Sequence, residues 1–490
     1  MIRLAIALLC ICFLVPRLPA QTVRARLDFG KRDPKPEFVE YASADNGLVT
    51  LGPSNKSSTR YLSIRKYDQN FQLEWEEKVI EQNGRKNVDF VTVIGQNILV
   101  FLSETFPKED VIKSYYYAFN LAGEKLADQS ILSVYPNEKE QKVSLQFTHS
   151  PNKRKLLCYK NLRQRRESEK LLYYIFDDEG DFLTNGAIEL PYPDNRFRVK
   201  SLRLSNQGNV FVLGKFFLAG QVKNPDDFQY LVMQYNTAAE AGNEVKIDLG
   251  DRYITDLAFR VDRAENMYLA GFYSNRSTDR IGGTILQKIS PSGEVLLQST
   301  EAFGQSFLSN YLSSGQINRG RELRNFYMDA EDGIILRSDG GVLLIAEKFY
   351  VTYQSYQDIY GYWVDREMYH YEDVILTSVS PQGEIEWHAI VDKNQVSDSP
   401  ANLSYFNAIG GDGAYIFYEY RPPRRGVNIY YNIVAIDGQV SKRIPLISNY
   451  QFGNAFYPRY CEQINNREAI MVYQQNRGRA LSVVKVGIGE

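Results

Sequence analysis

The segment SDGGVLLIAE, residues 338–347, joins a glycine turn to a short apolar run. A bounded run of this length after a turn is typical of a buried strand. The same pattern recurs seven more times along the chain. The other copies are ADNGLVTLG (44–52), IGQNILVFL (94–102), SPNKRKLLCY (150–159), SNQGNVFVLG (205–214), RAENMYLAG (263–271), GGDGAYIFYE (410–419) and NNREAIMVY (465–473).

A second pattern, in which two alternating strands flank a turn, lies between the copies of the first, as in TSVSPQGEIEW (377–387). Alternation of apolar and polar residues is typical of a strand with one buried face. The remaining copies are RKYDQNFQLEW (65–75), YAFNLAGEKL (117–126), YIFDDEGDFL (174–183), MQYNTAAEAGNEVKI (233–247), QKISPSGEVLL (287–297) and VAIDGQVSKRI (434–444). The two patterns together predict an all-β chain built from repeated pairs of hairpins.

Four-stranded units of about 50 to 60 residues in series are the signature of a β-propeller. The eight copies of the first pattern predict eight blades, with seven as the alternative. The last unit has room for three strands, whereas the alternating segment TVRARLDFG (22–30) precedes the first unit without a partner. We therefore expect this N-terminal strand to complete the last blade and close the ring. Because no linker rich in Pro, Gly or Ser divides the repeats, residues 21–490 are expected to form one domain.

The first twenty residues have the pattern of a secretory signal peptide. A basic start is followed by an apolar run from Leu4 to Val15 and by a small residue, Ala20, at the expected cleavage point. Residues 1–20 contain two of the 57 basic residues and no acid, so the remaining chain has 55 basic and 59 acidic residues, a net charge of −4. We expect an exported protein of the periplasm, cell surface or extracellular space, with no nucleic-acid partner and no integral membrane segment.

The cysteines and histidines do not predict a metal site or another cofactor. Cys158 and Cys461 remain after signal cleavage, and both lie in strand-like apolar runs of distant repeats, so two buried thiols are expected rather than a disulfide. The three histidines, at positions 149, 370 and 388, are scattered along the chain. Zinc sites use clustered Cys and His ligands, and no such cluster occurs.

The stretch FYVTYQSYQDIYGYWVDREMYHYED, residues 349–373, interrupts the regular repeats in the sixth unit. It connects the second and third strands of that blade and predicts a two-stranded hairpin that projects from the ring. Tyrosines stabilise twisted hairpins through cross-strand pairs, and they also make rigid recognition surfaces. The candidate binding residues of the hairpin are Tyr353, Tyr356, Tyr360, Tyr362, Trp363, Tyr369 and His370.

Two other irregular segments are expected on the same face of the ring as the hairpin. Residues 301–325 place Phe307, Leu308, Tyr311 and Leu312 at helical spacing, which predicts a helical insert. The loop RPPRRG (421–426) supplies Arg421, Arg424 and Arg425 beside the hairpin, where guanidinium groups would suit an anionic ligand or would simply be solvated.

Glu347 and Asp373 flank the base of the predicted hairpin. Two carboxylates near a pocket can perform the acid–base work of glycoside cleavage. Ion pairs with neighbours such as Lys348 or Arg366 would explain the same residues without catalysis. The sequence alone leaves both interpretations open.

The segments DGGVLLIAEKFY, YEDVILTSVSPQGEIEW and VDKNQ, together with the Tyr-rich stretch, resemble a group of secreted bacterial β-propeller proteins of unassigned function. The resemblance covers residues 325–395 and is generic to repeats elsewhere. It implies export and a propeller fold, and it carries over no catalytic residue.

Two functions follow from these observations as hypotheses. The first is an exported, non-catalytic binding or scaffold protein, monomeric, that recognises a protein or glycan through the face carrying the hairpin. The alternative is an extracellular polysaccharide-degrading enzyme, a glycoside hydrolase or lyase, with Glu347, Asp373 and Arg424 near a pocket at the propeller centre. Aromatic rings in a concave site with carboxylates between them would favour the enzyme, and a convex patch of rings would favour binding.

Overall fold

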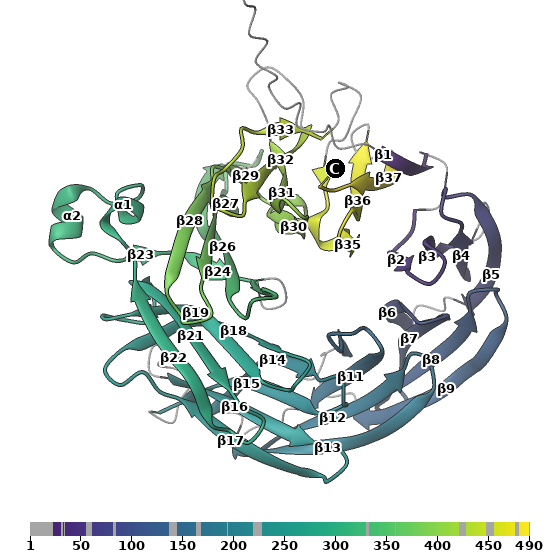
Figure 1. Cartoon of the computed structure of the whole chain (residues 1–490). Helices are drawn as coiled ribbons and strands as arrows, with labels where there is room; N and C mark the ends of the chain where they lie inside the picture. Colours follow the sequence, from purple (N-terminus) through teal and green to yellow (C-terminus); the bar gives the residue numbers. More distant parts are fainter. Residues whose placement is uncertain are drawn as a thin grey trace, which may run out of the picture.

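The computed structural model describes residues 23–30, 33, 35–54, 61–81, 85–136, 145–162, 168–193, 195–218, 228–329, 333–357, 359–420, 428–446, 455–475 and 480–489. The predicted signal peptide (1–20) and Arg421, Arg424 and Arg425 lie outside these residues. The chain is an all-β propeller, in which antiparallel sheets are arranged in a ring, each with one edge towards the centre (Figure 1). The described strands form eight sheets of four or more strands and one two-stranded ribbon. The eight-blade count stays a prediction, and these eight sheets are compatible with it.

Each of the first four sheets follows the chain from its inner to its outer strand. Their strands are β2 (Phe38–Ala42), β3 (Gly47–Pro53), β4 (Tyr61–Tyr67) and β5 (Leu73–Glu81); β6 (Lys86–Ile94), β7 (Asn97–Phe106), β8 (Val111–Asn120) and β9 (Lys125–Pro136); β10 (Gln146–His149), β11 (Lys155–Leu162), β12 (Ser168–Asp177) and β13 (Phe182–Pro193); and β14 (Phe197–Leu204), β15 (Val210–Phe217), β16 (Phe228–Asn236) and β17 (Ala241–Ile247).

The last four sheets are less regular, because short strands split some of their edges. Their strands are β18 (Tyr253–Val261), β19 (Met267–Ser274), β21 (Gly283–Ile289) and β22 (Val295–Ala302); β24 (Phe326–Met328), β25 (Ile334–Leu336), β26 (Val342–Gln357), β27 (Trp363–Val379), β28 (Ile385–Val391) and β29 (Gln395–Ser397); β30 (Tyr405–Ile409), β31 (Gly413–Tyr420), β32 (Asn428–Ala435) and β33 (Ile444–Pro445); and β34 (Ala455–Phe456), β35 (Glu462–Asn465), β36 (Glu468–Gln475), β37 (Ala480–Gly487) and β1 (Val23–Phe29). The ribbon pairs β20 (Arg280–Ile281) with β23 (Leu323–Arg324).

The hydrophobic core is divided into clusters that lie between neighbouring sheets. One cluster joins Val49 and Leu51 of the first sheet to Val100 and Leu102 of the second, and similar clusters join every consecutive pair. A further cluster joins the eighth sheet to the first and completes the ring. Each sheet buries both of its faces against neighbours, so its stability depends on the whole ring.

The eighth sheet is assembled from both ends of the chain. Strand β1 pairs antiparallel with β37, as in the pair Leu27 and Val483, and forms the outer edge of the sheet. The N-terminal strand therefore closes the ring, as the sequence predicted. Lys485 of β37 then reaches the first sheet, where its Nζ donates to the backbone oxygens of Asn46 (3.1 Å) and Gln69 (3.2 Å).

Two tryptophans join outer strands to the next sheet. The Trp75 Nε1 group donates to the oxygen of Leu121 (2.9 Å), and the Trp387 Nε1 group donates to that of Ile436 (2.8 Å). Gly123, which has a φ of 90°, lies against the Trp75 ring, and a Cβ built there would be 3.2 Å from an indole carbon. Glycine is needed at this turn both for the positive φ and for the close approach.

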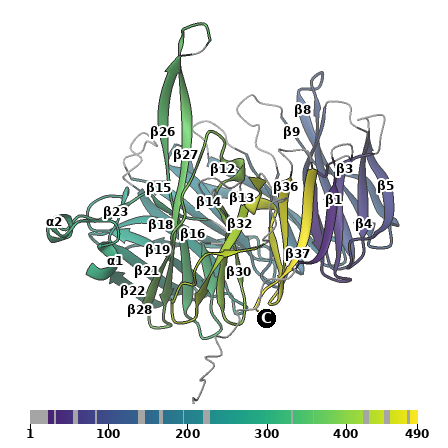
Figure 2. The ribbon, with the colours of Figure 1, turned by 90° about the horizontal axis from the view of Figure 1, so that it is seen from above.

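The sixth sheet carries the main additions to the ring. Strands β26 and β27 continue past the sheet as a two-stranded arm that stands clear of the ring (Figure 2). The segment predicted to be helical contains α1 (Gln305–Leu308) and α2 (Ser314–Asn318) at the outer rim. Helix α1 packs on the outer strand β28, where the ring of Phe307 stacks on that of His388 with a centroid distance of 4.4 Å. Within the described ranges, no helix is long and apolar enough to cross a membrane.

Candidate functional site

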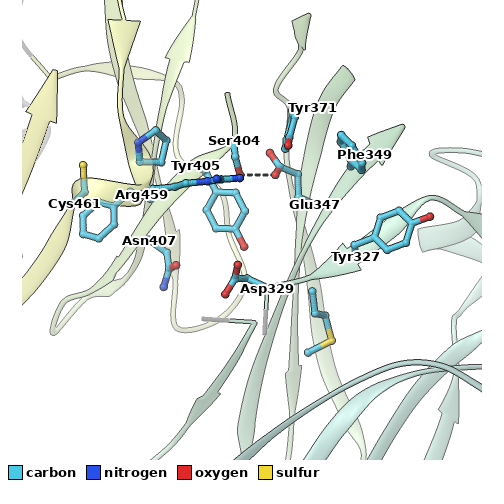
Figure 3. Close-up of a pocket in the computed structure, with 13 residues that line it drawn as sticks. Tyr327, Asp329, Glu347, Phe349, Tyr371, Ser404, Tyr405, Asn407, Arg459 and Cys461 are labelled. Atoms are coloured by element: carbon cyan, nitrogen blue, oxygen red, sulfur yellow. Dashed lines mark hydrogen bonds between the residues drawn. The ribbon is translucent and has the colours of Figure 1, made fainter. Parts of the chain in front are cut away.

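A pocket of about 480 Å³ lies at the foot of the arm, on the inner side of the ring (Figure 3). Its walls come from the inner strands of the sixth and seventh sheets, from the start of the arm, and from η2 (Pro458–Tyr460), a 3₁₀ turn of the eighth sheet. The lining residues are Tyr327, Met328, Asp329, Glu347, Phe349, Tyr371, Ser404, Tyr405, Phe406, Asn407, Pro458, Arg459 and Cys461. A concave site of this size, lined by rings with a few polar groups between them, is typical of a small-ligand site.

Three rings form a continuous row along one wall of the pocket. The centroids of Tyr327 and Phe349 are 6.3 Å apart with an interplanar angle of 70°, and those of Phe349 and Tyr371 are 4.7 Å apart at 49°. Edge and tilted contacts are the geometries that aromatic pairs favour. Tyr405 extends into the same pocket from the opposite wall (Figure 3).

Glu347 is fixed in the pocket wall by a buried ion pair. Its Oε1 lies 2.5 Å from Nζ of Lys393, whose side chain is fully buried, and Ser404 Oγ donates to Glu347 Oε2 at 2.5 Å. Lys393 Nζ also donates to Gln395 Oε1 (2.9 Å), which accepts the backbone N–H of Ser404 (2.9 Å). Burial raises the pKa of Glu347 and lowers that of Lys393, and the charge of each partner opposes the shift of the other.

Two residues beside the pocket have strained backbones. Ser404 has a φ of 84° and Asn325 has a φ of 65°, a region that costs non-glycine residues free energy. Each lies just before an inner strand, and each is held by hydrogen bonds: Ser404 as described above, and Asn325 through its oxygen, which accepts the N–H of Phe349 (2.8 Å). Such strain persists where the surroundings impose it, and it is concentrated at functional sites.

Asp373 does not line this pocket, so the structure does not bring the two predicted carboxylates together there. Glu347 is opposite Val374 in the sheet, and a bulge separates that pair from the next, Phe349 and Tyr371. Asp373 accepts the N–H of Lys393 (3.4 Å) and lies near Tyr311, whose pKa is raised first by burial and then by the Asp373 charge. The neighbours named from the sequence have other partners, since Lys348 pairs with Glu372 and Arg366 with Asp398.

The register of the arm divides its side chains between two faces. The pairs Val351 with Tyr369, Tyr353 with Glu367 and Gln357 with Trp363 share the face of Phe349 and Tyr371. This face leads from the pocket towards the tip of the arm and carries Tyr369, Tyr353 and Trp363 in order. The two carboxylates on this face accept hydrogen bonds within the arm. Tyr369 OH donates to Glu367 (2.6 Å), and Ser355 Oγ donates to Asp365 (2.5 Å).

The opposite face of the arm has a structural explanation for some of its rings. His370 stacks on Tyr350 at 4.5 Å with an interplanar angle of 9°, and its Nε2 lies 2.8 Å from Thr352 Oγ1. Tyr350 OH donates to Glu372 at 2.6 Å. Tyr356 shares this face, whereas Tyr360 and Tyr362 lie at the turn.

The tip of the arm is the most exposed aromatic region in the described chain. Ile359 is 91% exposed, Tyr360 is 78%, Tyr362 is 72% and Trp363 is 71%. The foot is better supported, because β29 pairs with β27 at Tyr369–Tyr371 and adds a third strand. The arm therefore has a braced foot and an open tip.

Sequence reasoning did not find Tyr327, Asp329, Tyr405, Asn407 and Arg459. Each is an ordinary residue of a strand or turn, and their segments lie far apart in the chain. The signal that could have identified them is position, since they lie in or next to the inner strands β24 and β30 and in the turn η2 before β35.

No protein-family model and no curated protein matches the chain. Among solved structures, polysaccharide lyase Uly1 is 8% identical with a TM-score of 0.43, over 96% of this chain and 98% of that one. The β-propeller domain of the Trilobed protease from Pyrococcus furiosus is 10% identical with a TM-score of 0.33, over 82% and 93%. An acylaminoacyl peptidase from Pyrococcus horikoshii is 9% identical with a TM-score of 0.32, over 83% and 59%. Similarities at this level assign no function.

Proposed function

We propose that this protein is an exported, non-catalytic binding protein that acts as a monomer and holds a glycan in the pocket at the foot of the arm. The observation that carries the proposal is the row of Tyr327, Phe349 and Tyr371 in a concave site that also contains Asp329, Asn407 and Arg459. Sugar rings present flat C–H faces and many hydroxyls. Aromatic walls can pack on the faces, and the polar side chains can bond the hydroxyls.

The arm extends this site for a longer ligand. Tyr369, Tyr353 and Trp363 continue the aromatic wall away from the pocket on one face of the arm. Tyrosine and tryptophan provide large, rigid contact areas with polar groups at their edges. A chain of sugars that enters the pocket by one end would lie along this face. The export that residues 1–20 predict, and the resemblance to secreted propellers, agree with an extracellular or periplasmic ligand of this kind.

Two features of the site favour binding over catalysis. Glu347 is paired with Lys393, and Asp373 does not line the pocket, so the carboxylate pair suggested by the sequence is not available there. One observation keeps the degrading enzyme as the second candidate function: Asp329 and Glu347 both line the pocket, and the charge of Asp329 contributes to the raised pKa of Glu347, after burial as the main cause. Glycosidases use two carboxylates around the scissile bond.

A glycan array followed by calorimetry tests the proposal. We expect Tyr371→Ala and Tyr327→Ala to weaken binding of an array hit by about tenfold or more, since each removes a ring from the wall. Tyr253→Ala, an exposed tyrosine of β18 outside the pocket, is the matched control. Equal binding by all three variants would refute the pocket as the site.

The same ligand separates the two candidate functions. Prolonged incubation with the wild type should return it intact by chromatography, and Glu347→Gln should give the same result. Thermal unfolding of that variant checks its fold, because the substitution leaves the buried Lys393 without its carboxylate. Cleavage products that disappear in Glu347→Gln would establish the enzyme instead.

A further inference from the structure

We propose that the pocket selects an acidic sugar, and that Arg459 binds its carboxylate. This inference rests on the proposed glycan-binding function and names the class of sugar that the site takes. The acidic sugar is the unit that the pocket holds. The sugars that lie along the arm are expected to be uncharged.

Arg459 is presented to the pocket from a rigid turn. It lies in η2, between Pro458, which is buried, and Tyr460. The turn is held by the N–H of Tyr460, which donates to the oxygen of Tyr457 (3.1 Å), and by the N–H of Cys461, which donates to that of Pro458 (3.0 Å). The backbone of Arg459 is therefore fixed before a ligand arrives, which reduces the entropy that binding costs.

Arg459 brings a positive charge to the pocket. No hydrogen bond or ion pair joins its guanidinium to another residue in the part of the chain that the structure describes. Its charge acts on the pocket: burial and the Glu347 carboxylate raise the pKa of Tyr371, and the Arg459 charge opposes that rise. Figure 3 shows the guanidinium extending across the pocket towards Ser404. A planar fork of N–H donors beside rings fits a carboxylate with two parallel hydrogen bonds.

The other charges of the pocket leave this role to Arg459. The Glu347 carboxylate is matched by Lys393, so the pair adds no net charge. Asp329 is the remaining acid, and Figure 3 places it below the Tyr405 ring, with the Arg459 guanidinium above. Asp329 can therefore accept hydrogen bonds from the hydroxyls on one side of a sugar. Arg459 can donate to an acid group on the other side of the same sugar.

The rest of the ring centre is compatible with an acidic ligand. A second cavity of about 610 Å³ is lined by inner strands of six sheets. Three cations, Lys153, Arg203 and Arg260, and one carboxylate, Glu462, line it. Cations gathered in a cleft raise the local concentration of anions. By contrast, Asp365 and Glu367 lie on the pocket side of the arm, which is why the ligand is expected to be uncharged beyond its acidic unit.

The test uses oligosaccharides of three to six units that contain one uronic acid, each as the free acid and as its methyl ester. The ester keeps the shape of the sugar and removes the charge. We expect the wild type to bind at least one free acid about tenfold more tightly than its ester. Arg459→Gln should reduce that ratio to about twofold or less while retaining ester binding. Arg467→Gln, an exposed arginine of the turn between β35 and β36, should keep the wild-type ratio.

The possible results separate the two proposals. Equal affinity for acid and ester in the wild type, with binding weakened by Tyr371→Ala, would overturn the acidic-sugar inference and keep the glycan-binding function. Absence of binding by every acid and ester, together with an empty glycan array, would overturn both. Thermal unfolding of each variant checks that the variant is folded. A lost preference for the acid over its ester is then not caused by unfolding.

Discussion

The sixth and eighth sheets are the two irregular parts of the ring, and they are irregular in opposite ways. The sixth is one continuous piece of chain to which an arm, an extra edge strand and two short helices have been added. The eighth lacks a strand of its own and takes β1 from the other end of the chain. The first gains structure beyond what a blade needs, and the second is incomplete without a distant segment.

The comparison suggests that the arm of the sixth sheet serves the function of the protein, whereas β1 of the eighth sheet serves its stability. The arm of the sixth sheet rises from the candidate site, and its exposed tip contributes little to the core. The two helices lie apart from the site, at the outer rim, where Phe307 packs into the core. The additions to the eighth sheet contribute little to the site, but one core cluster depends on them, because Phe29 packs with Leu481 and Tyr41. Four substitutions or deletions test the contrast, from the largest expected effect to the smallest.

Removing residues 23–29 should have the largest effect. The deletion takes away the outer strand of the eighth sheet, the buried Phe29 ring and the Arg24–Glu468 ion pair (2.8 Å), and it leaves the edge of β37 unpaired. We expect the melting temperature to fall by more than about 5 °C. An unchanged melting temperature would show that β1 covers the ring without holding it closed.

Lys393→Met should cost about 3–5 kcal/mol, because it leaves Glu347 buried without its partner. The pKa of Glu347 is raised in the folded state, so the ionised form is the unfavourable one and stability is lost as the pH rises through that pKa. The deficit should therefore be larger at pH 8 than at pH 5. Chemical denaturation measures it, and the double variant Lys393→Met/Glu347→Gln should recover much of the loss. A single variant as stable as the wild type would mean that the foot of the arm is not held by this pair.

His388 should make stability depend on pH. Burial lowers its pKa from 6.5 to about 4, so the unfolded chain binds a proton at a higher pH than the folded one. Stability is then lost as the pH falls from 6.5 towards 4, by about 2 kcal/mol at pH 5 for this group. His388→Phe should remove the contribution of His388 to this loss of stability at low pH. The contribution of His149, whose pKa is also lowered to about 4, should remain in the variant. An identical decline in the variant would show that α1 does not bury this side chain in solution.

Replacing residues 356–364 by Asn-Gly should have the smallest effect on stability. Ser355 and Asp365 are paired across the arm, so a two-residue turn can join them without changing the register. We expect the melting temperature to stay within about 2 °C, while long glycans bind more weakly and single sugars bind as before. Calorimetry on ligands of increasing length checks this, and loss of cooperative unfolding would show that the tip is part of the fold.

The repeats in the sequence predicted the fold, because each strand pair has its own turn and apolar run. The closing strand could also be predicted, since an unpaired segment at one end matched a missing strand at the other. The site could not be predicted in the same way. The bulge between the Glu347 and Phe349 pairs decides which rings of the arm continue the pocket wall, and no residue type marks it. Lys393 lies in the polar stretch VDKNQ, yet the fold buries it completely.

The pairing of β1 with β37 also sets the order in which the molecule can be finished. The hydrogen bond from Ser482 to Asp28 joins residues 454 positions apart, so the pairing of β1 with β37 closes a loop that contains every other described strand. Contacts of such separation form late, because a long loop must close before they contribute. A chain cut short before residue 480 leaves β1 and β36 with unpaired edges, which are prone to aggregate. Ring closure thus depends on β1 and β37 together, and a chain without either strand cannot close the eighth sheet.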